Sequence, residues 1–171
     1  MSSCSGNCAS CSSSDCGDRK KESLLAALNP KASVKKVIAV VSGKGGVGKS
    51  TVTSMLAVAM ARTGKRVGVL DADIYGPSVP MMFGVDGKPE SSDGKTMEPL
   101  ENHGVQLMSI GLLLNNPNEA MIWRGPMATQ ALEQMLRSTN WKDLDYLVID
   151  LPPGTGDIQL TLSQKVPMTG S

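Results

Sequence analysis

The stretch VVSGKGGVGKST, from Val40 to Thr51, constrains the fold of this 171-residue chain more than any other feature. It fits the pattern G-x-x-x-x-G-K-[ST], in which a glycine-rich loop between a strand and a helix surrounds the phosphates of a nucleotide. Several backbone N–H groups must converge on one anion, which requires φ values that only glycine adopts without strain. Four residues are expected to supply those values: Gly43, Gly45, Gly46 and Gly48.

The side chains of this loop have expected roles in binding Mg-ATP. Lys49 places a positive charge against the β- and γ-phosphates, and the Ser50 hydroxyl ligates Mg²⁺. A second lysine, Lys44, lies near the start of the loop, and the spacing alone shows only another cation beside the phosphates. The predicted nucleotide-binding residues are Gly43, Lys44, Gly45, Gly46, Val47, Gly48, Lys49, Ser50 and Thr51.

The segments around the loop predict a strand before it and a helix after it. Residues 35–42 form a short β-branched apolar run, which is typical of a buried parallel strand. Residues 49–63 carry apolar side chains at helical spacing, and Gly64 ends the pattern. The apolar positions that predict this helix are Val52, Met55, Leu56, Ala59 and Met60.

Strands and helices alternate along the rest of the chain. Strands are expected at 65–73 and 104–111, and residues 145–157 are expected to form a strand that runs into a loop. A polar, turn-rich loop is expected at 84–99, and an amphipathic helix at 125–138. The residues expected to share the apolar face of that helix are Met127, Ala131, Leu132, Met135 and Leu136. The alternation predicts an α/β fold with a mostly parallel sheet flanked by helices.

Carboxylates at the ends of two predicted strands complete the expected catalytic set. Asp150 follows four apolar or aromatic residues, the pattern of a carboxylate that holds Mg²⁺, commonly through water. Asp71 and Asp73 end the second strand, and either could orient the attacking water or contact the water shell of the metal; Asp73 is favoured for this role. For Asp71, a structural role as a helix cap or loop hydrogen-bond acceptor is an equal alternative. Asp157 closes a Pro- and Gly-rich segment that suits a loop sensing the γ-phosphate. These patterns make Lys49 and Asp73 the expected catalytic residues, and a role for Lys44 comes only from the family that the loop resembles.

Charge and hydropathy argue against several classes of partner. The net charge of +1 gives no electrostatic case for binding nucleic acid. No apolar run is long enough to span a bilayer, and the N-terminus lacks the basic-then-apolar pattern of a secretory signal. We therefore expect a cytoplasmic protein without nucleic-acid or membrane partners.

The four cysteines all lie in residues 1–18, a Ser-, Gly- and Cys-rich arm with almost nothing to bury. They are Cys4, Cys8, Cys11 and Cys16. Four thiolates on such an arm suit an iron–sulfur cluster or, less favoured, a tetrahedral Zn²⁺; non-ligating or redox thiols are the remaining alternative. A short helix and linker are expected at 19–33, followed by the P-loop ATPase domain at 34–171.

Lys44 makes the loop resemble the deviant phosphate loop of the MinD/ParA and nitrogenase-reductase superfamily. The stretches SGKGGVGKST, DADIYGPSVP, WRGPM and VIDLPPGTGD are similar to the Mrp/ApbC family of iron–sulfur cluster carrier ATPases, over residues 35–171. The resemblance implies a homodimer in which Lys44 contacts the phosphates bound by the partner subunit. It also implies slow ATP hydrolysis and the transfer of a [4Fe-4S] cluster to apo-proteins. The alternative is a ParA- or MinD-type positioning ATPase, which calls for a basic patch or an amphipathic membrane helix, and neither is visible.

The sequence departs from that family in its cysteines and at its end. The family holds a bridging cluster on a C-x-x-C pair in its C-terminal part, but no cysteine follows Cys16 here. Some members carry an N-terminal four-cysteine cluster site whose first spacer is longer than the one in this chain. The chain stops at VPMTGS, where the family continues into another strand, so we expect a fragment without the adenine pocket and with one sheet edge unpaired.

Overall fold

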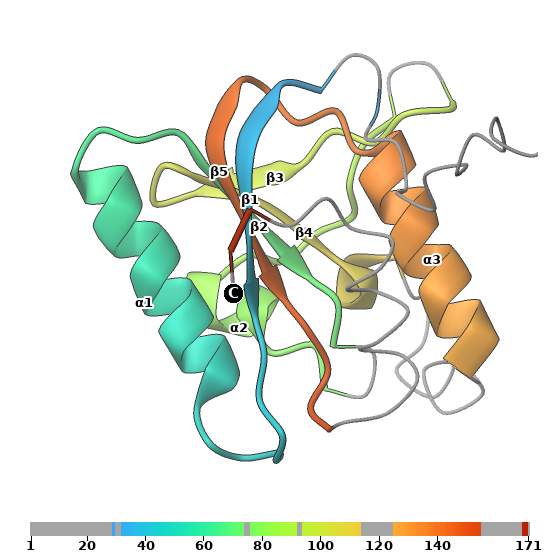
Figure 1. The fold of residues 1–171 in the computed structure, drawn as a ribbon. Helices are drawn as coiled ribbons and strands as arrows, with labels where there is room; N and C mark the ends of the chain where they lie inside the picture. The colour runs from blue at the N-terminus through green and yellow to red at the C-terminus, as the bar shows by residue number, and fades with distance from the viewer. Residues whose placement is uncertain are drawn as a thin grey trace, which may run out of the picture.

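Five strands form one sheet in the order β1-β5-β2-β4-β3, with helices on both of its faces (Figure 1). The computed structural model describes residues 29, 32–73, 76–91, 94–113, 125–154 and 169–170, with the backbone alone for residues 125–129. The strands are β1 (Val34–Val40), β2 (Val67–Asp71), β3 (Leu100–Asn102), β4 (Val105–Ser109) and β5 (Leu144–Asp150). The helices are α1 (Lys49–Arg62), α2 (Val79–Phe83), the short 3₁₀ helix η2 (Ile110–Leu112) and α3 (Gly125–Ser138).

The four longer strands are parallel, so their carboxyl ends lie together at the same end of the sheet. In the pairing registers, Val40 of β1 lies opposite Asp150 of β5, and Asp150 lies opposite Asp71 of β2. Asp71 in turn lies opposite Ser109 of β4. The mostly parallel α/β fold is confirmed, and β5, which ends in Asp150, lies beside β1, which leads into the glycine loop. This register brings the predicted acidic residues to the end of the sheet where the loop begins.

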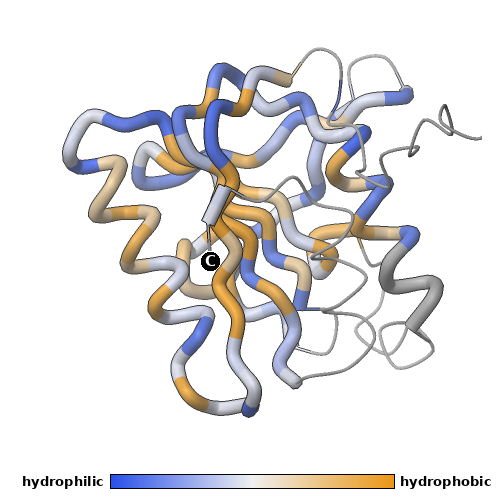
Figure 2. The backbone as a smooth tube through the Cα atoms, in the orientation of Figure 1, coloured by the Kyte–Doolittle hydropathy of each residue, from blue (hydrophilic) through white to orange (hydrophobic). Residues whose placement is uncertain are grey.

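Apolar side chains fill both layers between the sheet and its helices. In Figure 2 much of the backbone of the strands is orange, the colour of hydrophobic residues. Along β5, Leu147 and Ile149 belong to the core under α3, whereas Val148 belongs to the core under α1. Alternate side chains of a strand point to opposite faces, so a central strand covered on both faces must be apolar throughout. For this reason the strands could be recognised in the sequence as continuous apolar runs.

Of the five apolar positions that predicted α1, Leu56 and Met60 pack against the core and the other three do not. Val52 and Met55 are 56% and 68% exposed, and Ala59 is also exposed, whereas Thr53 and Ala57 are fully buried against the sheet. Lys49, Thr53 and Ala57 are spaced by four residues and therefore share one face of the helix. Because Lys49 points toward β5, the residues one and two turns further on must face the sheet as well, whatever their hydropathy.

For α3 the predicted face is confirmed at Leu132, Met135 and Leu136, which are buried.

The strand β3 and the helix α2 were not predicted. The strand β3 consists of Leu100, Glu101 and Asn102 and runs antiparallel to β4, too short for an alternating pattern to be visible. The helix α2 has five residues and lies in a segment that gave no helical periodicity. The strand β3 exists through its hairpin with β4, and α2 packs against α1 and β4, so neither element depends on a periodicity of its own.

The strand β1 lies at one edge of the described sheet. On its outer side, the described residues add a single parallel bridge between Ile38 and Gly170. The backbone N–H of Ala39 donates to the carbonyl of Gly170 at 3.1 Å, and that of Thr169 donates to Val37 at 2.7 Å. Beyond this bridge, no other described strand pairs with the outer side of β1.

Asp145, near the start of β5, connects three strands. Its carboxylate accepts a hydrogen bond from the Lys35 ammonium of β1 at 2.7 Å and one from the backbone N–H of Arg66, just before β2, at 3.0 Å. The Lys35 hydrogen bond, followed by that from Arg66, lowers the pKa of Asp145 to about 2 from an ordinary value of 3.8. The ionised carboxylate therefore helps to hold the central strands in register.

We expect Asp145→Asn to make stability less sensitive to acid. A carboxyl whose pKa is lowered by folding stabilises the protein above the unfolded-state pKa, and this contribution is lost as the pH falls through the folded-state value. The free energy of unfolding should therefore be lower in the variant at neutral pH and should fall less than in the wild type between about pH 5 and pH 2. Urea unfolding at several pH values measures both effects, with Asp143→Asn, an exposed neighbour, as the control. Superimposable pH profiles for Asp145→Asn and the wild type would contradict this role.

Candidate active site

A cavity of about 350 Å³ lies where the glycine loop, the start of α1 and the segment after β2 meet. Its lining contains seven of the nine predicted nucleotide-binding residues, and the two that do not line it are Gly43 and Val47. The Val47 side chain is 60% exposed at the surface of the loop. The full lining is Ser42, Lys44, Gly45, Gly46, Gly48, Lys49, Ser50, Thr51, Asp73, Gly76, Ser78, Met82 and Pro153.

The loop needs glycine for backbone conformation at two positions rather than four. Gly46 and Gly48 have φ values of 74° and 86°, in the left-handed region that other residues adopt only with strain. Gly43 and Gly45 lie outside that region, and a side chain at either would meet nothing closer than 3.9 Å. The expectation that all four glycines supply unusual φ values is therefore wrong for Gly43 and Gly45.

The start of α1 forms an anion-binding end of the helix. Gly48 is its N-cap, has no side chain to cap the helix, and accepts the first helical hydrogen bond from Val52 at 2.9 Å. The first turn also contains no acidic residue. Free N–H groups and the helix dipole together favour a phosphate at this position.

Lys49 and Asp150 form a buried ion pair at the base of the cavity. The Lys49 ammonium lies 2.6 Å from Oδ1 of Asp150, and the two side chains are 6% and 1% exposed. The Thr53 hydroxyl donates to the same oxygen at 3.0 Å. The second carboxylate oxygen, Oδ2, is buried and has no hydrogen-bond partner among the described residues. Oδ1 thus orients the lysine, and Oδ2 remains available as an acceptor.

The oxygen donors at this site fit a magnesium ion. Mg²⁺ prefers oxygen ligands and is usually held by one or two protein groups together with waters and substrate phosphates. The Ser50 hydroxyl lines the cavity, and the unpaired Oδ2 of Asp150 is a natural acceptor for a metal-bound water. Within the described part of the chain, no group of three or more His, Cys, Asp or Glu side chains is arranged to hold a metal without such help.

The structure gives Asp71 and Asp73 different surroundings. Asp73 lines the cavity and is half-buried, whereas Asp71 is fully buried and does not line it. The Asp71 carboxylate accepts hydrogen bonds from the backbone N–H groups of Asp73 and Val79 and from the Ser109 hydroxyl. Burial raises the pKa of Asp71 to about 7, against the opposing hydrogen bond from Asp73. Of the two roles left open for Asp71 by the sequence, the geometry supports that of a loop hydrogen-bond acceptor.

Lys44 lies on the outer wall of the cavity. Its residue is exposed, and its backbone carbonyl accepts a hydrogen bond from the Ser42 hydroxyl at 2.9 Å, which shapes the first turn of the loop. In the part of the chain that the structure describes, no carboxylate forms an ion pair with Lys44. Lys44 is therefore an exposed cation of the cavity wall, whereas Lys49 is buried.

The sequence of residues 33–171 matches the family model described as ParA, the NUBPL iron-transfer P-loop NTPases. The chain belongs to this iron-transfer P-loop NTPase family. The result confirms the family that the sequence motifs indicated.

Curated relatives in the iron-transfer family are named iron-sulfur cluster carrier proteins. The Salmonella typhimurium protein is 61% identical over 139 residues, which cover 81% of this chain and 37% of that protein. The Methanococcus maripaludis protein is 51% identical over 169 residues, covering 96% of this chain and 58% of the relative. The chain thus spans between about a third and three-fifths of the length of these two relatives.

Solved structures share the arrangement of strands and helices. A nucleotide-binding protein from Archaeoglobus fulgidus in complex with ADP has a TM-score of 0.66 and 47% identity, over 77% of this chain and 50% of that chain. The septum site-determining protein MinD from Pyrococcus horikoshii, complexed with Mg-ADP, has a TM-score of 0.52 and 21% identity, over 74% of this chain and 53% of that chain. The similarity to MinD shows the fold alone.

None of the described helices is long and apolar enough to cross a membrane.

Several predicted site residues lie outside the described part of the chain. They are Cys4, Cys8, Cys11, Cys16 and Asp157. The division into an arm at 1–18, a linker at 19–33 and an ATPase domain at 34–171 also stays a prediction.

Some residues of the site were not predicted from the sequence. Thr53 was missed, although its position one helical turn after Lys49 was a usable signal. Gly76, Ser78 and Pro153 lie in the DADIYGPSVP and VIDLPPGTGD motifs but were not assigned to the site, and Met82 had no signal of its own.

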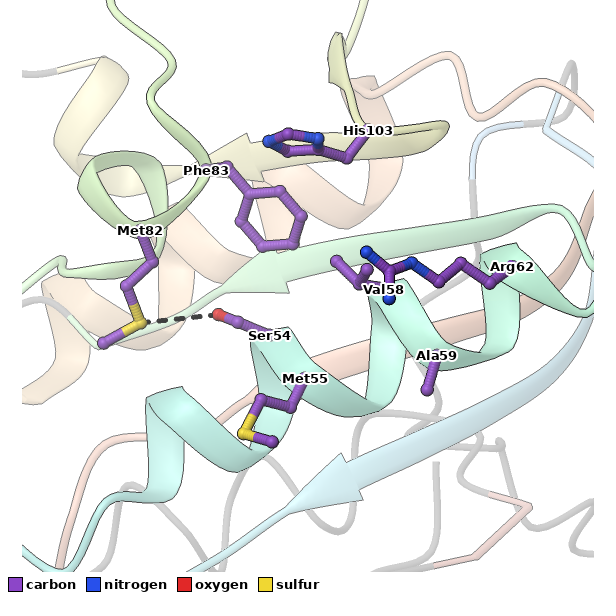
Figure 3. Close-up of a pocket in the computed structure, with 8 residues that line it drawn as sticks. All are labelled: Ser54, Met55, Val58, Ala59, Arg62, Met82, Phe83 and His103. Carbon is purple, nitrogen blue, oxygen red and sulfur yellow. Dashed lines mark hydrogen bonds between the residues drawn. The ribbon is translucent and has the colours of Figure 1, made fainter.

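A second cavity of about 450 Å³ lies beside the first, between α1, α2 and the turn from β3 to β4 (Figure 3). It is lined by Ser54, Met55, Val58, Ala59, Arg62, Met82, Phe83 and His103. Met82 lines both cavities, and its sulfur accepts a hydrogen bond from the Ser54 hydroxyl at 3.5 Å. This second cavity contains none of the predicted phosphate- or metal-binding groups, so the chemistry of the family belongs to the first.

Proposed function

We propose that this protein binds and slowly hydrolyses ATP as part of an iron–sulfur carrier that assembles [4Fe-4S] clusters and transfers them to apo-proteins. The convergence of Lys49, Lys44 and Asp73 on one cavity, in a member of an iron-transfer NTPase family, carries this proposal. The names of the carrier relatives and the ADP in the Archaeoglobus fulgidus structure support it.

The residues of the cavity suit phosphoryl transfer to water. Lys49, oriented by Asp150, stabilises negative charge on the β- and γ-phosphates, and the N–H groups at the start of α1 hold the same oxygens. The half-buried carboxylate of Asp73 orients the attacking water. A magnesium ion, when bound, is held by Ser50 and, through water, by Asp150, and it neutralises charge on the phosphates.

Lys44 is proposed to act in a homodimer. An exposed cation on the cavity wall is suited to reach phosphates bound by a second copy of the chain, and there it would act like an arginine finger. This arrangement would make hydrolysis depend on dimer formation. The sequence identity of this chain to MinD is below 25%, so that similarity indicates only a shared fold. It does not favour the alternative function of positioning cargo on DNA or a membrane.

The cysteine arm is proposed to hold a cluster in the reducing environment of the cytoplasm, where thiols remain free to act as ligands. The similarity to the Methanococcus maripaludis carrier covers 96% of this chain, so it extends into the arm. The proposed client proteins are apo-proteins that need a [4Fe-4S] cluster.

We expect Cys11→Ser to weaken or abolish cluster binding after anaerobic reconstitution of the full-length protein with iron and sulfide. Three remaining thiolates leave one coordination position to solvent, so the cluster should be lost to chelators faster than from the wild type. Visible absorption with iron and sulfide analysis measures the bound cluster, and Ser12→Ala in the same arm is the control. Tight uptake of zinc and no cluster by the wild type would replace the iron–sulfur assignment with a zinc site.

Transfer is tested with a purified apo-enzyme whose activity requires a [4Fe-4S] cluster. The loaded protein should restore that activity in the presence of a chelator that captures free iron, and Mg-ATP should change the rate. A loaded protein that activates the apo-enzyme no faster than free iron and sulfide would refute the carrier function.

A further inference from the structure

We propose that Asp71 and Ser109 are positioning residues that fix the chain directly after β2 and directly before α2, so that Asp73 faces the nucleotide in register with Asp150. This inference rests on the proposed ATP hydrolysis and adds to it two residues outside the cavity. Neither side chain lines the cavity, and both are fully buried. Their effect on the reaction would therefore be exerted through Asp73.

The Asp71 carboxylate holds both ends of the connection between β2 and α2. Its Oδ1 accepts the backbone N–H of Asp73 at 3.1 Å, and its Oδ2 accepts that of Val79, the first residue of α2, at 3.3 Å. Ser78, the N-cap residue of α2, makes no side-chain capping bond, so Asp71 supplies the acceptor that a helix start requires. One buried carboxylate thus sets the position of the chain directly after β2 and directly before α2.

Ser109 and Gly111 fix that carboxylate from the neighbouring strand. The Ser109 hydroxyl donates to Oδ2 of Asp71 at 3.1 Å and accepts the backbone N–H of Gly111 at the same distance. A Cβ atom on Gly111 would lie 2.7 Å from Cγ and 2.8 Å from Cβ of Pro77, inside any tolerable contact. The end of β4 therefore touches the β2–α2 connection both by a hydrogen bond to Asp71 and by close packing on Pro77.

The same connection is tied to the metal-side carboxylate. Asp71 lies opposite Asp150 in the parallel register, and the backbone N–H of Ala72 donates to the Asp150 carbonyl at 2.9 Å. Asp73 follows directly, so its position relative to Asp150 is set by this bond on Ala72 and by its own backbone hydrogen bond to Asp71. Displacements of about 1 Å in such groups are enough to lower turnover on the order of a hundredfold.

The test uses Ser109→Ala and Gly111→Ala in the full-length protein. Each should reduce kcat for ATP by about tenfold to a hundredfold while leaving the Kd for Mg-ATP within about twofold, because the glycine loop is untouched. Ser109→Thr retains the hydroxyl and should recover much of the rate lost in Ser109→Ala. Thr139→Val, which removes a buried hydroxyl without a described partner, and Gly170→Ala, at a glycine with open space around it, are the matched controls.

Hydrogen exchange provides a readout that does not depend on turnover. In Ser109→Ala, the amides of Asp73 and Val79 should exchange at least tenfold faster, while those of β2 and β5 keep their protection. Equal loss of protection across the whole sheet would show a purely structural role and overturn the inference, as would wild-type kcat in Ser109→Ala and Gly111→Ala. A wild type without any ATP turnover would refute the proposed hydrolysis instead, and the exchange measurement would still decide whether Ser109 positions the connection. Should Ser109→Ala fail to fold, Ser109→Cys, which keeps the size of the side chain and weakens its hydrogen bond to Asp71, tests the inference by both measurements.

Discussion

Replacing Lys49 with alanine is expected to remove nearly all Mg-ATP affinity and to destabilise the fold at the same time. The ammonium is the buried cation of the cavity, and hydrogen bonds to charged groups contribute about 1.5–3 kcal/mol each. Loss of its contacts to two phosphates should therefore raise the Kd at least about a hundredfold. Isothermal titration calorimetry of the full-length protein measures this change.

The loss of stability has a separate cause. Asp150 is 1% exposed, and without Lys49 its carboxylate keeps only the Thr53 hydroxyl as a described side-chain partner. Removing one member of a buried ion pair typically costs about 3–5 kcal/mol, because the other charge remains buried without compensation. Urea unfolding should therefore show a marked decrease in the free energy of unfolding of Lys49→Ala.

A double variant separates the two effects. Lys49→Ala combined with Asp150→Asn should recover part of the stability, since no buried charge remains, and should still fail to bind Mg-ATP. Lys44→Ala changes an exposed lysine of the same loop and serves as the stability control. Wild-type affinity in a folded Lys49→Ala protein would show that the loop is not the nucleotide site.

The second large effect is expected for Lys44→Ala, which should bind Mg-ATP normally and lose turnover by on the order of a thousandfold or more. Cations that stabilise the charge of the transition state from across an interface contribute about 10³–10⁵ to kcat. Lys44 is exposed and has no described ion pair, so its removal should leave the stability of the subunit unchanged. Steady-state turnover and equilibrium binding, measured on the same preparation, separate the two steps.

Mixing variants tests whether Lys44 acts across a dimer. In a mixed dimer of Lys44→Ala and Asp73→Asn subunits, one of the two sites receives Lys44 from one chain and Asp73 from the other. Random exchange makes about half of the dimers mixed, so about a quarter of wild-type turnover should return. No recovery would place Lys44 in its own site, and wild-type turnover by Lys44→Ala alone would leave it as an ordinary loop cation.

Local patterns in the sequence were sufficient for the framework of the site. The glycine spacing before Lys49 identified the loop and placed the start of α1 correctly, because backbone conformation and helix initiation depend on adjacent residues. The apolar run that ends in Asp150 predicted a strand, since a strand covered on both faces has little freedom in composition. Family membership followed from the same short motifs.

Tertiary structure alone decided how these parts face one another. The rotation of α1 exposes Met55 and buries Thr53 because the Lys49–Asp150 ion pair fixes the helix against β5. The spacing of apolar residues along the helix carries no information about this ion pair. The role of Asp71 was decided by its burial and its hydrogen bonds, one of which comes from Ser109, 38 residues away in the chain, through the register of β2 with β4. Sequence patterns report conformations set by neighbouring residues, whereas burial, ion pairing and register arise from contacts that exist only once the chain has folded.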